Sequence, residues 1–242
     1  MFNWLNHILM KKLFVLILML HLASRAELQI LKLPKLPGLG GDEIAKGLKE
    51  ALNNGISKGS DLLSQADGYY KSPYKILIPA EAVKVIDKLK YVPGFADVDE
   101  QLTLRLNRAA ELAAQKAKPI FIKAIQDMSF KDATNILMGS DTSATGYLRQ
   151  STYTPLYTEF RPVILDALNE VHAAEYWQSA VTAYNKIPLV KKTNPSLDDY
   201  ATEQALKGLF SMIAKEEVGI RKDISLRSSD LLKKVFAKQD KK

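Results

Sequence analysis

Apolar residues recur at every third or fourth position along most of the chain, which is the period of an amphipathic α-helix. The longest such stripe runs from Val98 to Met128, and its middle is rich in alanine. Pro119 lies inside this stripe and should kink the helix, because proline lacks the N–H that the helical ladder needs. No segment keeps the two-residue alternation of a half-buried strand. The pattern therefore predicts an all-α fold, an irregular single-domain bundle of about six to eight helices with a long central helix.

Residues that favour helix ends divide the rest of the chain. The expected helix starts are two N-caps and three pairs with capping-box spacing: Asp42, Asp141, Asp97 with Glu100, Ser129 with Asp132, and Ser196 with Asp199. Gly139 supplies a helix stop, and Pro155 and Pro162 should interrupt the helix that Asp141 begins. The helices expected from these signals cover about 42–63, 79–91, 97–128, 129–138, 141–184, 196–220 and 229–236.

Three glycines, Gly47, Gly55 and Gly59, lie along the first of these helices. Each costs about 1 kcal/mol relative to alanine in a helix interior. They either permit a neighbouring helix to pack closely or mark a weak helix.

The N-terminus has the three parts of a secretory signal peptide. Lys11 and Lys12 form a basic region, LFVLILMLHL forms an apolar one, and small residues precede a cut before Glu27. The apolar run is too short to cross a bilayer, which takes about 20 such residues. We therefore expect residues 1–26 to be a signal peptide, with an uncleaved anchor as the alternative. Met10 is the expected true start, because MKKLFVLILML already forms a complete signal.

The remaining chain divides by composition. Residues 27–41 contain two prolines and three glycines, which predicts an extended leader. Residues 42–236 form the helical domain, and 237–242 form a basic tail. No transmembrane span is expected once the signal has been cleaved.

Composition excludes several classes of function. Cysteine is absent, which excludes disulfides, thiolate metal sites and cysteine nucleophiles. The net charge is +7, and because Lys11, Lys12 and Arg25 leave with the signal it falls to +4. That charge is too small for a nucleic-acid reader, and no basic block interleaves with aromatic residues. We expect no nucleic-acid partner.

Recognisable catalytic and cofactor motifs are also absent. Of the three histidines, only His172 remains after signal cleavage, so a multi-histidine metal site is excluded. The chain has no G-x-S-x-G nucleophile elbow and no glycine-rich phosphate cradle. The sequence therefore assigns no catalytic residue, no metal ligand and no cofactor.

Two carboxylates stand where apolar residues are expected. Glu216 interrupts the apolar stripe of the helix that begins near Ser196, and Glu217 lies beside it. A buried carboxylate needs a cation, so Arg221, Arg227 or Lys118 should be near. Structural ion pairing is the favoured interpretation, and acid–base chemistry by the two glutamates is the alternative.

Other polar residues gather on two helix faces. Asn107, Glu111 and Lys118 share one side of the central helix, which is typical of a solvated or ion-paired face. The helix after Asp141 carries an aromatic and basic flank that could cover the bundle or bind a carboxylate, sugar or lipid headgroup: Tyr147, Arg149, Tyr153, Tyr157 and Arg161.

The strings LNRAAELAAQKAKPIFIKAIQDMSFKDATNIL, GSDTSATGYLRQST and LDDYATEQALKGLFSMIAKEEVGIRKD resemble an exported family of Gram-negative bacteria, the domain-of-unknown-function 4197 family. The resemblance covers about 42–236, and it implies a periplasmic helical domain without supplying a reaction or ligand. The positions that match the family pattern form a candidate polar or ligand cluster: Asn107, Arg108, Glu111, Lys118, Asp141, Thr145, Tyr147, Arg149, Arg161, Glu216, Glu217, Arg221 and Asp230.

Three functions are compatible with these observations. The first is a non-enzymatic periplasmic module that binds an unknown protein or envelope partner. The second is a binder of a lipid or another amphipathic or anionic small molecule, held in the bundle interior with Tyr147, Arg149 and Arg161 at its headgroup. The third, the least favoured, is an acid–base enzyme using Glu216 or Glu217. A wide apolar cavity would favour the second, and a tightly filled core with a bare apolar surface patch would favour the first.

Overall fold

The computed structural model describes residues 40–79, 97–170 and 196–241, together with a few single positions between these ranges. The described part contains seven α-helices and no strand, which confirms the all-α fold and the expected number of helices. The signal peptide, nearly all of the leader and nearly all of the helix expected over 79–91 lie outside the described residues. The described helices belong to one compact unit, Leu39–Lys242.

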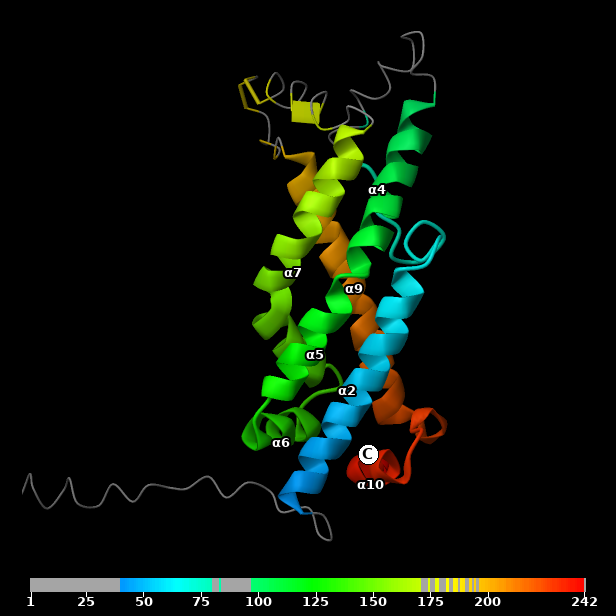
Figure 1. Ribbon diagram of the computed structural model, residues 1–242, viewed down its shortest axis with the longest axis vertical. Coiled ribbons are helices and arrows are strands. Elements are labelled where there is room, and N and C mark those ends of the chain that lie inside the picture. Colours follow the sequence, from blue (N-terminus) through cyan, green and yellow to red (C-terminus); the bar gives the residue numbers. More distant parts are fainter. Residues whose placement is uncertain are drawn as a thin grey trace, which may run out of the picture. The chain divides into compact units, whose positions relative to one another are not determined.

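The helices α2, α4, α5, α7 and α9 run side by side, as Figure 1 shows. Their bounds and those of the shorter elements are α2 Gly41–Leu63, α4 Val98–Ala114, α5 Ala117–Asp127, α6 Phe130–Met138, α7 Ser143–Asn169, α9 Leu197–Lys222, the 3₁₀ helix η1 Ile224–Leu226, α10 Asp230–Phe236 and the 3₁₀ helix η2 Ala237–Lys241. Helix α9 packs on α2 and α7, α4 packs on α7, and α2 also contacts α5, α6 and α10. The expected basic tail, residues 237–242, contains the 3₁₀ helix η2.

The N-cap of helix α2 lies two residues earlier than its sequence indicates. Its N-cap is Gly40 and not Asp42, which lies with Glu43 in the first helical turn. The Glu43 carboxylate accepts the Gly40 N–H at 2.9 Å. The N-cap prediction at Asp42 was wrong because an acidic residue also suits the first turn, where it faces the positive end of the helix dipole.

The expected central helix is broken in two. Helix α4 ends at Ala114 and α5 begins at Ala117, with a turn at Gln115 and Lys116 between them. Pro119 lies in the first turn of α5, where a missing N–H costs little, and its ring would clash with the carbonyl of Gln115 in a continuous helix. The kink expected at Pro119 is therefore a break four residues earlier.

The capping-box predictions had mixed outcomes. At α6 the box is present, because the Ser129 hydroxyl accepts the Asp132 N–H at 3.1 Å and Asp132 accepts the Ser129 N–H at 3.2 Å. Gly139 ends that helix as expected. Asp97 is the N-cap of α4, but its side chain makes no capping hydrogen bond. The box predicted for Asp97 and Glu100 was wrong.

Helix α7 continues through both prolines that were expected to interrupt it. Pro155 and Pro162 lie on its exposed side, so the carbonyls that each proline leaves without a helical partner, those of Ser151 and Thr158, can meet water. Helix α7 ends at Asn169, and most of the continuation expected to residue 184 lies outside the described residues.

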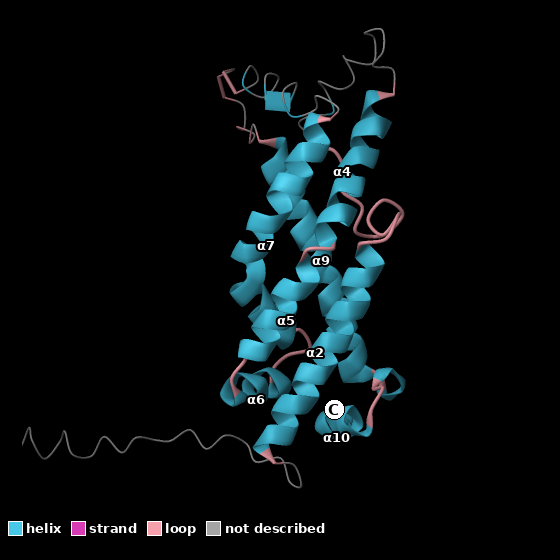
Figure 2. Ribbon diagram, in the orientation of Figure 1, coloured by secondary structure: helices cyan, strands magenta, loops and turns pink. Residues whose placement is uncertain are grey.

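The three glycines of α2 are buried where other helices approach it. A Cβ at Gly47 would lie 2.5 Å from Val235 Cγ2 of α10, and one at Gly59 would lie 3.1 Å from Met212 Cγ of α9. Close packing, and not a weak helix, is therefore the role of these two positions. Figure 2 shows that α2 is one uninterrupted helix.

Candidate functional site

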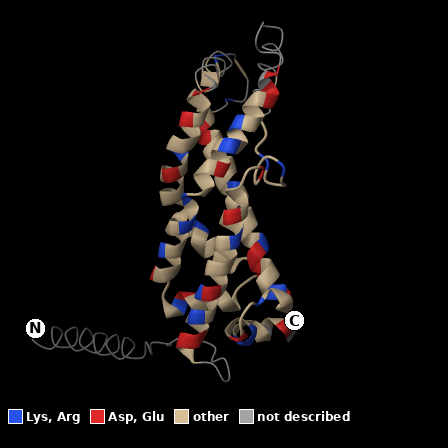
Figure 3. Ribbon diagram, turned by 45° about the vertical axis from the view of Figure 1, so that its right-hand side comes forward, with Lys and Arg blue, Asp and Glu red and all other residues tan. Residues whose placement is uncertain are grey.

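The charged residues of the candidate set lie in several places on the bundle. Figure 3 shows acidic and basic positions interspersed along the described helices. Three groups of polar contacts contain most of the candidates, and each is named here after one member: the Glu111 cluster, the Glu217 cluster and the Arg161 cluster.

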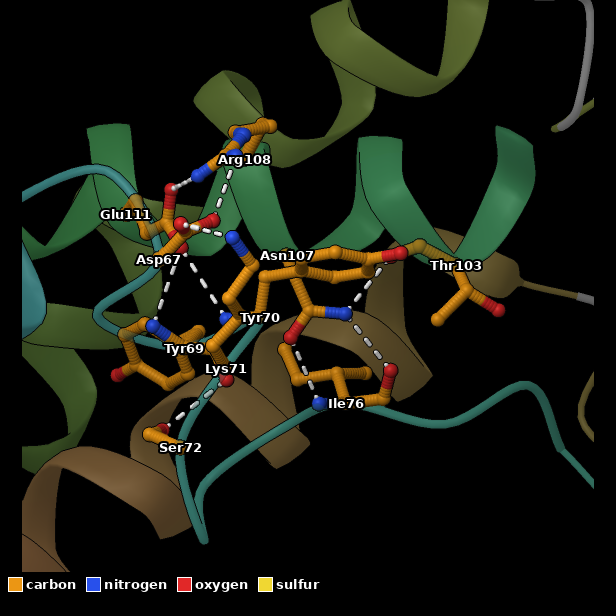
Figure 4. Close-up of polar contacts among 10 residues, drawn as sticks. All are labelled: Asp67, Tyr69, Tyr70, Lys71, Ser72, Ile76, Thr103, Asn107, Arg108 and Glu111. Atoms are coloured by element: carbon orange, nitrogen blue, oxygen red, sulfur yellow. Dashed lines mark hydrogen bonds and ion pairs between the residues drawn. The ribbon is translucent and has the colours of Figure 1, made fainter. Parts of the chain in front are cut away.

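The Glu111 cluster joins α4 to the loop that follows α2 (Figure 4). Glu111 Oε1 accepts the backbone N–H groups of Tyr69 at 3.1 Å and Tyr70 at 3.2 Å. Its Oε2 pairs with Arg108 at 2.7 Å, and Arg108 reaches Asp67 at 2.7 Å. Hydrogen bonds from Lys71 and from the Arg108 guanidinium hold the pKa of Asp67 below its usual value. One carboxylate thus satisfies two loop amides that would otherwise lack partners.

Asn107 holds the same loop one helical turn earlier on α4. Its side chain accepts the Ile76 N–H at 2.8 Å and donates to the Ile76 carbonyl at 2.8 Å and the Thr103 carbonyl at 2.7 Å. Asn107 is 0% exposed and Glu111 is 4% exposed. The solvated face expected on α4 was therefore wrong for these two residues, although the ion pairing of Glu111 was expected correctly.

Lys118 does not belong to this cluster. It lies on α5, beyond the break in the expected central helix, and pairs with Asp61 at 3.5 Å. The spacing of seven from Glu111 to Lys118 would have placed both on one face only in a continuous helix.

The Glu217 cluster joins α9 to the start of α7 and the end of α6. Glu217 Oε1 accepts the Ala144 N–H at 2.9 Å, while Oε2 accepts the Thr145 N–H at 2.8 Å and the Thr145 hydroxyl at 2.7 Å. Arg221 Nε donates to Glu217 at 3.0 Å and its two terminal nitrogens donate to the carbonyls of Leu137 and Ile136. Glu217 caps one helix start and Arg221 caps one helix end.

These contacts correct two predictions. The first-turn N–H groups of α7 bind Glu217, and Asp141 instead pairs with Lys222 at 2.7 Å. The N-cap of α7 is Thr142, without a side-chain hydrogen bond. Of the two adjacent glutamates, Glu217 is the buried one at 7% exposed, whereas Glu216 reaches the α2 surface and pairs with Lys58 at 2.8 Å.

A second buried arginine extends this region to the C-terminal elements. Arg227 donates hydrogen bonds to the carbonyls of Ile220 and Arg221. Its two terminal nitrogens both donate to the Asp240 carboxylate, at 2.9 and 2.7 Å. It was expected near the paired glutamates, but its carboxylate partner is Asp240. Asp230 lies in the first turn of α10 and pairs with Lys233 at 3.3 Å.

The Arg161 cluster joins α7 to the start of α9. Arg161 Nε lies 2.7 Å from Asp198 and 3.3 Å from Asp199, and the Tyr157 hydroxyl donates to Asp199. Burial is the largest cause that raises the pKa of Tyr157, to about 12, followed by the hydrogen bond to Asp199. The polar ends of this flank are therefore engaged with α9.

The aromatic part of the same flank also packs on α9. Tyr153 stacks between Tyr157 and Phe210, with ring centroids 6.4 and 6.5 Å away, and Arg149 lies 5.3 Å from the Phe210 ring centre. Tyr147 lies apart from this stack, near Asp132 and Asp127, and burial raises its pKa. The flank covers the bundle, as one of the two interpretations predicted.

Three hollows accompany these clusters. An apolar cavity of about 20 Å³ lies between α2 and α9 beside Glu217, and it has room for one water. A cleft of about 470 Å³ lies between the ends of α6 and α9 and residues Gln239 and Asp240 of η2, and it is here named the α6–α9 cleft. A groove of about 170 Å³ lies between the loop at 73–76 and α9.

Several contributors to these sites carry no signal in the sequence. Asp67 and Asp198 each complete an ion pair with a residue about forty positions away, and Asp240 pairs with Arg227 across η1 and α10. Gly208 was the one available hint, because a glycine inside a long helix suggests a close approach, and the ring of Tyr69 lies against it. Among the described residues, no group of histidine and acidic side chains could hold a metal ion.

Comparison with known proteins gives a family and no activity. None of the described helices combines the length and the apolar character needed to cross a membrane. No curated protein and no solved structure matches the chain. One family model, described as "Protein of unknown function (DUF4197)", matches residues 38–237, in agreement with the resemblance noted above. The chain therefore belongs to the DUF4197 family.

Proposed function

We propose that this chain is an exported, periplasmic helical protein that acts by binding a partner and not by catalysis. The observation that carries the proposal is the internal engagement of the candidate charges. Glu111, Glu217 and Arg161 all bind backbone groups or opposite charges within the bundle. Charges placed in this way order the loop and the helix ends, and these three side chains are already engaged by the fold.

The geometry of the paired glutamates argues against acid–base catalysis. A general base must come within hydrogen-bond reach of the proton that it removes. Glu217 already accepts hydrogen bonds from two backbone amides, a hydroxyl and a guanidinium. Glu216 is bound to Lys58 on the neighbouring helix. Neither carboxylate has the free, substrate-facing position that the enzyme hypothesis needs.

A binding surface is available at the α6–α9 cleft. Its volume of about 470 Å³ falls within the range of about 300–1,000 Å³ that is typical of ligand pockets. Met138, 43% exposed, forms an apolar part of its wall, and Lys222 with Asp141 forms a charged part. This mixture suits an apolar side chain of a partner protein with polar groups around it.

Binding of a lipid within the bundle is the alternative, and it has less support. The alanines of α4 at positions 109, 110, 113 and 114 are fully buried by neighbouring helices. The apolar cavity beside Glu217 has room for one water and not for an acyl chain. To admit an acyl chain, these helices would have to move apart and open a much larger cavity.

Export rests on the N-terminal sequence. A basic pair, an apolar run and small residues before Glu27 are the features that a secretion machinery reads. The absence of cysteine means that the folded part needs no disulfide chemistry in that compartment.

Site-specific photo-crosslinking tests the proposal. The full chain would be expressed with its own leader in a Gram-negative host, with a photo-reactive residue at Met138 or, as a control, at Leu112, an exposed apolar position on α4. We expect the Met138 probe to give a defined covalent adduct in the periplasmic fraction and the Leu112 probe to give none. Native mass spectrometry of the same fraction would identify a bound lipid by its mass, which would support the alternative. Retention of the chain in the cytoplasm with residues 1–26 intact would refute export.

A further inference from the structure

The groove between the loop at 73–76 and α9 contains polar groups that have no partner, in contrast with the three clusters. Its walls are formed by Tyr74, Lys75 and Ile76 on the loop side and by Gln204, Lys207 and Ser211 on α9. Its volume is about 170 Å³. We name it the Lys75–Lys207 groove after the two cations that flank it.

Both lysines lack a carboxylate within the described part of the chain. Lys75 places its ammonium over the ring of Tyr70, 4.3 Å from the ring centre, and Lys207 is exposed on α9. Lys71, by contrast, pairs with Asp67 at 2.9 Å. Lys75 and Lys207 therefore have no carboxylate partner among the described residues, although the Lys75 ammonium contacts the Tyr70 ring.

The groove also offers neutral hydrogen-bond donors. The Gln204 amide and the Ser211 hydroxyl line it, and neither makes a hydrogen bond among the described residues. Gln204 and Ser211 lie seven residues apart on α9, which puts them two turns apart on one face with Lys207 between them. The side chains of two lysines, a glutamine and a serine thus line one small hollow.

The walls of the groove are held in place before anything binds. Asn107 fixes Ile76 through its N–H and carbonyl, and the Tyr69 hydroxyl donates to the Ala205 carbonyl at 2.7 Å. Gly208 lets the loop lie directly on α9, because a Cβ there would come within 2.8 Å of the Tyr69 ring and 3.2 Å of Tyr74 Cβ. A preformed site loses less free energy in ordering its groups when a ligand arrives.

We propose that the Lys75–Lys207 groove binds a phosphate-type oxyanion, with the two ammonium groups supplying charge and Gln204 and Ser211 supplying hydrogen bonds. Lysine is a common phosphate ligand that acts as a point charge. Pockets for larger organic ligands typically have volumes of about 300 Å³ or more. The smaller volume of this groove therefore fits an anionic group and not a whole nucleotide. This site is separate from the α6–α9 cleft and does not depend on the function proposed there.

Two carboxylates near the groove, those of Glu203 and Glu216, lower its expected affinity for an anion. Glu203 is exposed on α9, four residues before Lys207, but makes no ion pair with it among the described residues. Glu216 lies near Tyr74 and is already bound to Lys58. We therefore expect weak binding, with a dissociation constant of roughly a millimolar, which falls off as salt screens the lysines.

Titration of the full chain with inorganic phosphate tests the site, by calorimetry in a low-salt buffer that contains no other oxyanion. The variant K75Q/K207Q should lose phosphate affinity by tenfold or more. The matched control K131Q/K234Q removes two exposed lysines from α6 and α10, which no described ion pair contains, and should keep the affinity. Ser211→Tyr fills the groove without changing its charge and should also abolish binding.

Two arms separate the sources of the oxyanion. Flotation with phosphatidylcholine vesicles, with and without phosphatidic acid, reports a lipid headgroup, whereas the calorimetry reports free phosphate. Binding in either arm that is lost in K75Q/K207Q and in Ser211→Tyr, and kept in the control, supports the site. No binding in both arms, or an equal loss in K131Q/K234Q, overturns it. Circular dichroism of each variant confirms that the helices are intact.

Discussion

At the scale of single residues, the neighbouring carboxylates of Glu216 and Glu217 have different structural roles. Glu217 is buried with Arg221 and caps α7, whereas Glu216 pairs with an exposed lysine across a helix surface. Removing one partner of a buried, hydrogen-bonded ion pair typically costs about 3–5 kcal/mol. Removing an ion pair whose cation is exposed to water, as Lys58 is, costs less.

Glu217→Gln should therefore lower the free energy of unfolding by about 3–5 kcal/mol, because the amide cannot accept all four hydrogen bonds and leaves Arg221 without its counter-charge. Glu216→Gln is the adjacent control and should lower it by less, because the Glu216 carboxylate has one partner, Lys58, whose side chain is 56% exposed. Urea denaturation followed by circular dichroism measures both. Equal losses in the two variants would contradict the assignment of Glu217 as the cap of α7.

Tyr157 gives a second prediction at this scale. Burial and the hydrogen bond to Asp199 raise its pKa to about 12, from the usual 10. The phenol is neutral below both values, so its contribution to stability is complete below pH 10 and is lost as the pH rises to 12. In Tyr157→Phe, a spectrophotometric titration should lack one phenolate that forms near pH 12. Its thermal stability should also fall less steeply above pH 10 than that of the parent chain.

At the scale of elements, the glycines of α2 separate packing from helix propensity. A Cβ at Gly55 would lie 3.5 Å from Glu216 Cβ and 3.9 Å from Ile220 Cδ1, which is ordinary contact, whereas one at Gly47 would overlap Val235 of α10. Alanine at position 55 gains helix propensity and fills space beside the small apolar cavity that Gly55 lines. Alanine at position 47 must displace α10.

Gly55→Ala should therefore raise the free energy of unfolding by up to about 1 kcal/mol. Gly47→Ala should lower it by about 1–3 kcal/mol through overpacking. Thermal unfolding by circular dichroism compares them, with Gly59→Ala expected between the two because Met212 Cγ, 3.1 Å from its Cβ, belongs to a flexible side chain. A stabilised Gly47→Ala would show that α10 does not lie against α2.

The helices themselves could be predicted from local signals, and their ends only in part. The apolar period located α2, α6, α9 and α10, and Ser129 with Asp132 identified the start of α6, because all the necessary contacts lie within a few residues. The failures at Asp42 and Asp141 share one cause. An acidic residue near a helix start can serve as the N-cap, lie in the first turn or pair with a lysine from another helix. The spacing of residues in the sequence does not distinguish these three roles. The breaks predicted at Pro155 and Pro162 were wrong because exposure to water decides whether a helix tolerates proline, and exposure is a property of the tertiary structure.

At the scale of the whole molecule, the candidate residues could be chosen from the sequence but not grouped. The pair Glu217–Arg221 was predicted because it lies one helical turn apart. The partners that complete it, the amides of Ala144 and Thr145, are more than seventy residues away. Lys75 and Lys207 gave no signal, since exposed lysines are common and only the fold brings these two to one groove.

Three carboxylates whose pKa values the fold lowers should govern the response of the whole molecule to acid. Asp67 anchors the loop after α2 to α4 and Asp240 anchors η2 to Arg227, while Asp223 caps η1. Hydrogen bonds to cations lower the pKa of the first two below the usual 3.8, and hydrogen bonds from Ser225 lower that of Asp223. Since the unfolded chain then binds more protons, their stabilisation is complete above pH 3.8 and is lost as the pH falls through the lower values of the folded state.

The triple variant D67N/D223N/D240N should therefore be less stable than the parent chain at neutral pH and should approach it as the pH falls below about 3.8, where the parent's carboxylates also become neutral. Thermal unfolding measured from pH 7 to pH 2 would give the two curves. Asp166→Asn is the control, because that exposed carboxylate on α7 makes no hydrogen bond or ion pair with the described residues. If the triple variant stayed below the parent by a constant margin down to pH 2, the three carboxylates would not be coupled to folding through their protons, and the loop and tail would be held by packing instead.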